Sequence, residues 1–102
     1  MRKHDFRSLY DRYPAAINRM PEIFTSHQFI LTLAQENQRL YIEALYSYRM
    51  REAPFKVVHG ILAAYLRHVS KLVRRLGNAD VASPNVFGEH GSCALWQRVG
   101  TH

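Results

Sequence analysis

Apolar residues recur at helical spacing along two stretches of this sequence, 26–49 and 56–76, and this pattern limits the fold more than any other feature. Recurrence every three or four residues places apolar side chains on one face of an α-helix. In the second stretch that face is continuous: Val58, Ile61, Leu62, Tyr65, Leu66, Val69, Leu72, Val73 and Leu76. We therefore predict a mainly α-helical protein in which 56–76 is one helix, ended by Gly77. A bend between Arg67 and Ser70 is the alternative to a straight helix.

The first stretch carries a specific signal for a helix start. Thr25 and Gln28 have the spacing of a capping box, in which each side chain bonds the backbone N–H of the other residue. Phe24 and Phe29 stand where a hydrophobic staple would pack across the first turn. A helix is therefore expected to begin at Ser26.

Within 26–49 the apolar residues occupy two sides of the predicted helix. Such a helix is either buried between layers or broken, and the polar stretch 35–38 is the natural place for a break. One of the two sides is a candidate partner interface: Leu31, Ile42 and Tyr46. Either residues 4–20 or a second protomer could cover this side.

The N-terminal region is expected to add short helical pieces at 4–12 and 14–20. Pro14 can be the first helical residue of the second piece, where its missing N–H costs nothing. A chain of 102 residues has the size of one domain. We divide it into an N-terminal helical extension, 1–23, and a core, 24–99.

The last quarter of the sequence is rich in glycine and in β-forming residues. Segments 80–87 and 93–99 flank a Gly-rich turn, which predicts a β-hairpin. Pro84 cannot donate a ladder hydrogen bond, so the first strand should lie at an edge. Leu95 and Trp96 are expected to anchor the hairpin on the helices, with the indole N–H near a polar partner.

The charge of the chain favours polyanionic partners. Fourteen Lys and Arg stand against eight Asp and Glu, a formal net charge of +6. Residues 53–79 contain five basic residues and no acidic one. On a 56–76 helix, four cations would share the face opposite the apolar stripe: Arg67, Lys71, Arg74 and Arg75. Because like charges one turn apart repel, such a face suits an external anion, unless the charges serve only to complement the helix dipole.

Over residues 24–99, the order of three segments resembles that of the winged helix-turn-helix DNA-binding domains. The segments are FTSHQFI and PFKVVHGILAAYL, which each open a predicted helix, and SPNVFGEHGSCALW, which would be the wing. The resemblance implies a winged-helix-like core with 56–76 as recognition helix. It also places the major-groove face on six residues: His59, Gly60, Ala63, Arg67, Lys71 and Arg74. The turn 88–91 would be the wing tip, where Glu89 departs from the usual basic residues and only His90 could meet phosphate. The turn 49–54 is longer than the about three to four residues typical of this motif.

Catalytic and metal-binding patterns are missing from the sequence. His90 and Cys93 have a spacing that zinc could use, but a structural site needs four ligands. No Gly-rich phosphate loop or close carboxylate pair occurs, and no third group orients a base beside Cys93. We therefore expect no enzyme activity, cofactor, metal or small-molecule substrate. The sequence has a single cysteine, no apolar run of about 18 residues and no apolar core of a signal peptide. We therefore expect a cytoplasmic protein without a membrane partner.

These features lead to two functional expectations. The first is a domain that binds duplex DNA, as a transcriptional regulator or an architectural protein, through a defined set of residues: Lys56, His59, Arg67, Lys71, Arg74, Arg75 and His90. The alternative is a non-catalytic protein-interaction or dimerisation module of similar fold that uses the Leu31, Ile42 and Tyr46 surface.

Overall fold

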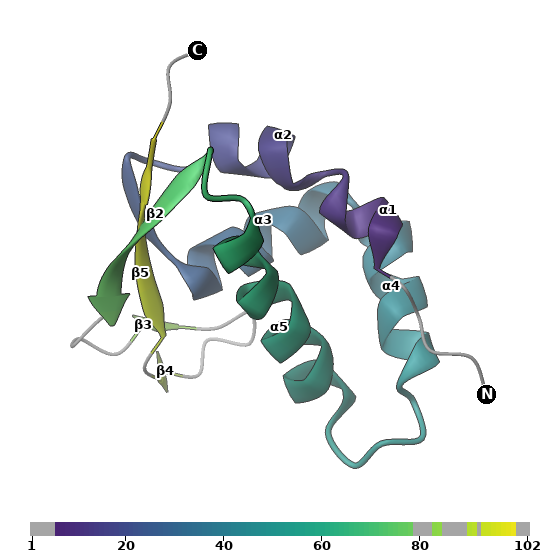
Figure 1. Cartoon of the computed structure of the whole chain (residues 1–102). Coiled ribbons are helices and arrows are strands. Elements are labelled where there is room, and N and C mark those ends of the chain that lie inside the picture. Colours follow the sequence, from purple (N-terminus) through teal and green to yellow (C-terminus); the bar gives the residue numbers. More distant parts are fainter. Residues whose placement is uncertain (1–5, 79–82, 85–89, 92, 100–102) are drawn as a thin grey trace.

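The protein is mainly α-helical, with a small antiparallel sheet to one side of the helices (Figure 1). The computed structural model describes residues 6–78, 83–84, 90–91 and 93–99. The helical segments are α1 Arg7–Tyr10, α2 Tyr13–Asn18, α3 Ser26–Glu36, α4 Gln38–Ser47, α5 Pro54–Tyr65 and the 3₁₀ turn η1 Leu66–His68. The strands are β1 Ile23–Thr25, β2 Val73–Asn78, β3 Ser83–Pro84, β4 His90–Gly91 and β5 Ala94–Arg98.

The predicted start of α3 is confirmed. The Gln28 backbone N–H donates to Thr25 Oγ1 at 3.1 Å, and the Thr25 N–H donates to Gln28 Oε1 at 2.8 Å, which completes a capping box. The rings of Phe24 and Phe29 are both buried, with centroids 6.4 Å apart, as a hydrophobic staple requires. The staple fixes the direction in which β1 leads into α3.

Thr25→Ala is expected to lower the free energy of unfolding by about 0.5–2 kcal/mol, because the first turn of α3 loses its side-chain acceptor. Urea unfolding followed by circular dichroism measures this change. Thr32→Ala, inside the same helix, is the matched control, since it removes a threonine without touching a cap. Equal stabilities for the two variants would contradict a stabilising role for the cap.

The stretch 26–49 forms two helices, which is one of the two arrangements expected from its pattern. The break falls at Asn37, inside the polar stretch, where the backbone leaves helical geometry at φ −136° and ψ 53°. The Asn37 side-chain amide donates to the Leu33 carbonyl at 3.0 Å and so occupies an acceptor at the end of α3. α4 therefore runs in a new direction, and side chains on α3 and α4 no longer share a common face.

The prediction of one helix over 56–76 is wrong. The helix ends at Tyr65, the chain tightens into η1, and Val73–Asn78 is a strand that pairs antiparallel with β5. Gly77 ends no helix; it lies in β2 with φ 135°, at a bulge in the ladder. Ser70 belongs to the turn between η1 and β2. The physical reason is the pairing with β5: bonds across the ladder replace those that a continued helix would make within itself, and β5 gains a partner strand along this edge.

The sheet has the strand order β1-β5-β2 (Figure 1). β5 confirms the predicted strand at 93–99, but the predicted pairing of this strand with 80–87 is wrong, because β5 pairs with β2 on one side and with β1 on the other. Within 80–87 the described part is β3, which pairs with β4 through two residue pairs. Residues 79–82 and 85–89, with the first half of the predicted wing tip 88–91, lie outside the described residues.

The N-terminal segment contributes directly to the hydrophobic core. Pro14 lies in the first turn of α2, which begins one residue earlier than expected. The Tyr13 hydroxyl is buried and donates to the Leu62 carbonyl, which ties α2 to α5. Six residues of this segment are buried: Phe6, Leu9, Tyr13, Ala16, Ile17 and Met20. Residues 6–20 therefore share one core with α3, α5 and the sheet.

Trp96 closes the core at the sheet. It is buried, and its indole N–H donates to Ser26 Oγ at 2.9 Å, so the polar partner expected from the sequence is present.

In the part of the chain that the structure describes, no helix is long and apolar enough to cross a membrane.

Candidate nucleic-acid interface

α5 has one side that faces away from the core. Val58 and Leu62 lie on the inner side of the helix and are buried in the core. The exposed residues on the outer side recur every three or four positions, and we call them the open side of α5: Lys56, Gly60, Ala64 and Arg67. Arg67 belongs to η1, which continues directly from the helix. The open side therefore carries a cation at each end and two small residues between them.

Gly60 has no packing reason within the described structure. A Cβ placed on it would meet no atom within 4 Å, and its φ is not in the left-handed region. Glycine in the interior of a helix costs about 0.5–1 kcal/mol relative to alanine. The open side therefore keeps a costly residue where the protein itself leaves empty space. Close approach of another molecule is a physical reason for such a residue.

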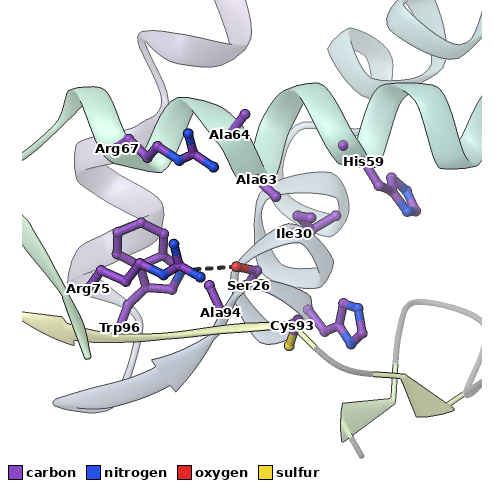
Figure 2. A pocket seen from close by; sticks show the side chains of 12 residues that line it. Ser26, Ile30, His59, Ala63, Ala64, Arg67, Arg75, Cys93, Ala94 and Trp96 are labelled. Atoms are coloured by element: carbon purple, nitrogen blue, oxygen red, sulfur yellow. Dashed lines mark hydrogen bonds between the residues drawn. The ribbon is translucent and has the colours of Figure 1, made fainter. Parts of the chain in front are cut away.

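A groove of about 350 Å³ lies between α5 and the sheet (Figure 2). In the close-up Arg67 comes from the α5 wall and Arg75 from the sheet wall, with Trp96 and Ser26 beyond them. The described residues that line the groove include no Asp or Glu: Ser26, His27, Ile30, His59, Gly60, Ala63, Ala64, Arg67, Arg75, Cys93, Ala94 and Trp96. The groove is thus bordered by cations and small side chains.

His59 lies on the groove and links two helices. Its Nε2 lies 2.6 Å from the Tyr41 hydroxyl on α4, and the two rings stack with centroids 5.8 Å apart. Burial lowers the pKa of His59 below its usual value, and the nearby charge of His27 lowers it further. The neutral form is therefore favoured, so His59 is better suited to join α4 and α5 than to neutralise a phosphate.

The four cations expected on one helix face do not share one. Because β2 is a strand, the neighbours Arg74 and Arg75 project from opposite faces of the sheet. Arg75 pairs across the ladder with Trp96. Arg74 instead donates to Gln97 Oε1, and the Gln97 amide donates to Glu22 Oε2 at 3.1 Å. Arg74 is thus linked to Glu22 only through Gln97, on the face opposite Arg75.

Three arginines border a second hollow near the turn that follows η1. Lys71 is exposed in this turn. The second hollow, of about 390 Å³, is lined by residues that include Arg67, Arg74, Arg75 and Ser70. The basic residues of this segment are thus divided between a 3₁₀ turn, a turn and a strand, a division that was not foreseen.

The other predicted residues are scattered. His90 lies in β4. Cys93 is half-buried on the groove, and the described residues hold no group of three potential metal ligands. Leu31, Ile42 and Tyr46 are all exposed, so residues 6–20 do not cover them. Leu31 lies on α3 and the other two on α4, so the break at residue 37 separates them.

Sequence reasoning missed the contribution of α3 and of the sheet to the groove. Ser26, Ile30 and Ala94 border it only because β5 places Trp96 against the start of α3. The one sequence signal for this contact between β5 and α3 was the expectation that the Trp96 indole N–H has a polar partner.

Comparisons with protein-family models, with curated protein sequences and with solved structures gave no match.

Proposed function

We propose that this protein binds duplex DNA and that the open side of α5 enters the major groove. The observation that carries the proposal is Gly60, a destabilising helix residue with empty space beside it, between the cations Lys56 and Arg67. Small side chains let a helix axis approach another molecule closely, and cations at both ends meet the phosphates that border a groove.

The order and pairing of the elements support a winged-helix-like architecture. Helices precede α5, a β-hairpin of β2 and β5 follows it, and β1 completes the sheet on the other side of β5. Such domains place the helix before the hairpin in the DNA groove. Two features depart from the motif. α4 is a separate helix after α3, and residues 48–53 make a connection longer than the usual about three to four residues.

Affinity would come mainly from phosphate contacts. Lys56, Arg67 and Lys71 are exposed on the open side and on the turn that follows it. Each phosphate that such a cation neutralises releases counterions, so binding should weaken steeply as salt rises. Arg75, across the groove from Arg67, could contact the backbone from the sheet side. Regulation of transcription and a cytoplasmic location are part of the same proposal.

Substitutions of Gly60 test the proposal because they separate stability from binding. Gly60→Ala is expected to raise the free energy of unfolding by about 0.5–1 kcal/mol, since alanine is the better helix former. Gly60→Leu should also fold, because its side chain points into open space. It should nevertheless weaken duplex binding by about tenfold or more, equivalent to about 1.4 kcal/mol, because its bulk separates α5 from the groove.

The matched control is Ala15→Leu, which adds the same side chain to an exposed site on α2. Fluorescence anisotropy with a labelled random duplex at low salt gives the affinities, and circular dichroism verifies the fold of each variant. Wild-type affinity in a folded Gly60→Leu variant would exclude the open side of α5 as the contact surface.

A further inference from the structure

Arg67 and Arg75 lie on opposite walls of the groove between α5 and the sheet, and both side chains extend into the space between the walls (Figure 2). The same two residues also line the second hollow, together with Trp96. Among the described residues that line either hollow there is no Asp or Glu. Two cations therefore border one space from opposite sides, and the resulting positive potential attracts an anion into it.

A buried hydroxyl group also lines the groove, and its proton has no acceptor in the described part of the chain. Ser26 is only 3% exposed and lies beyond the two arginines (Figure 2). Its Oγ accepts the indole N–H of Trp96 at 2.9 Å, which leaves the Ser26 proton for another acceptor. Because a buried donor without an acceptor costs free energy, an oxygen atom of a bound molecule is a physical reason for a hydroxyl at this place.

The start of α3 adds to the positive potential of the groove. Ser26 and His27 are the first two residues of this helix, and both line the groove. The N-terminus of a helix carries a partial positive charge that favours anions near its first turn. The cations of the two walls, the Ser26 hydroxyl and the positive end of α3 thus border the same space.

We infer that the groove is a binding site for one phosphate group, held between Arg67 and Arg75 with the Ser26 hydroxyl as a third donor. The three donors belong to η1, β2 and α3, so they approach the site from different elements. The tetrahedral oxygens of phosphate accept hydrogen bonds from several directions, whereas the two oxygens of a carboxylate lie in one plane. A guanidinium group also pairs with phosphate through two N–H donors.

The phosphate group has two chemical sources. It belongs either to the backbone of a bound duplex, in which case the inference rests on the proposed function, or to a free phosphate ion or phosphate monoester. Both sources present the same oxygen atoms to the two arginines, so the site is defined by the phosphate group itself.

Titration with inorganic phosphate in the absence of DNA tests the site. Trp96 is the only tryptophan and its indole N–H bonds Ser26, so its signal in a proton–nitrogen correlation spectrum reports on the groove. We expect a saturable shift of this signal at constant ionic strength, with weaker binding of acetate. Arg67→Gln and Arg75→Gln should each weaken phosphate binding by at least about tenfold, because a charged donor is lost. Arg12→Gln, at an exposed site of the N-terminal region, is the matched control and should bind phosphate like wild type.

Duplex binding by the same variants distinguishes the two sources of the phosphate. If the group belongs to the DNA backbone, Arg75→Gln should weaken duplex binding by at least about tenfold more than Arg12→Gln, which removes the same charge elsewhere. If the group is a free phosphate, the two variants should bind duplex equally, and only Arg75→Gln should lose its response to inorganic phosphate.

Three results would overturn the phosphate site, with circular dichroism to verify the fold of each variant. They are the lack of a saturable response of wild type to phosphate, equally tight binding of acetate, and wild-type phosphate affinity in either folded arginine variant. Failure of wild type to bind duplex at low salt would overturn the proposed function alone, because the phosphate titration contains no DNA.

Discussion

Trp96→Ala is expected to leave this protein poorly folded. The side chain is only 4% exposed, lies opposite Phe24 and Arg75 in the sheet, and bonds Ser26 at the start of α3. Truncating a buried aromatic residue costs about 3–5 kcal/mol, from a total stability of about 5–15 kcal/mol for a typical domain. The loss also leaves the buried Ser26 hydroxyl without its donor, which adds a desolvation cost.

Urea unfolding followed by circular dichroism measures this effect, since the variant has no tryptophan to follow. Trp96→Phe is the matched control: it keeps an aromatic ring in the site but loses the indole N–H, so it should be destabilised less. In the wild-type protein Trp96 is the only tryptophan, and its emission should be blue-shifted and poorly quenched by iodide. A red-shifted, freely quenched emission would contradict the proposed closure of the core.

Features determined by a few neighbouring residues could be predicted from the sequence. The capping box at Thr25 and Gln28 depends on residues three apart, and the break at Asn37 falls within a visible polar stretch. The burial of Trp96 and its polar partner also follow from local chemistry, because a large indole surrounded by β-formers has few other stable positions. For the cap and the break the decisive residues are close together in the chain, whereas for Trp96 only the need for a polar partner could be predicted and not that distant Ser26 supplies it.

The segment after Tyr65 could not be predicted in the same way. Val69, Leu72, Val73 and Leu76 satisfy helical spacing, yet Val73–Asn78 becomes a strand because β5, about twenty residues later, supplies its backbone partners. β1 is three residues long and is likewise defined by its pairing with β5. The sequence of a segment does not show which distant segment it pairs with, so the sheet order was not foreseen.

The residues of the candidate site also divide into those that local pattern predicts and those that depend on strand pairing. Arg67 belongs to the helical segment, and its exposed position followed from the helical pattern. Arg75 reaches the same groove only because it lies on a strand, and its neighbour Arg74 is directed to Gln97 on the opposite face for the same reason. Gly60 indicates a contact surface only because the space beside it is empty, and the sequence does not show that space.

Removing the two cations of the open side together with Lys71 should change the salt dependence of DNA binding more than an equal loss of charge elsewhere on the protein. The variant combines Lys56→Gln, Arg67→Gln and Lys71→Gln, all at exposed sites, so its fold should persist. Each lost phosphate contact lowers the slope of log affinity against log salt by about 0.9, so the three changes should flatten it by up to about 3 units. The control variant removes three exposed cations from the N-terminal helical region, Arg7, Arg12 and Arg19, with an equal loss of charge.

The most direct measurement is therefore the salt slope of duplex binding for wild type and for these two variants, each verified as folded by circular dichroism. The proposed interface predicts a steep slope for wild type, a flattened slope for the Lys56, Arg67 and Lys71 variant, and a nearly unchanged slope for the control. An unchanged slope for the first variant, or no binding by wild type at low salt, would contradict DNA recognition by the open side of α5.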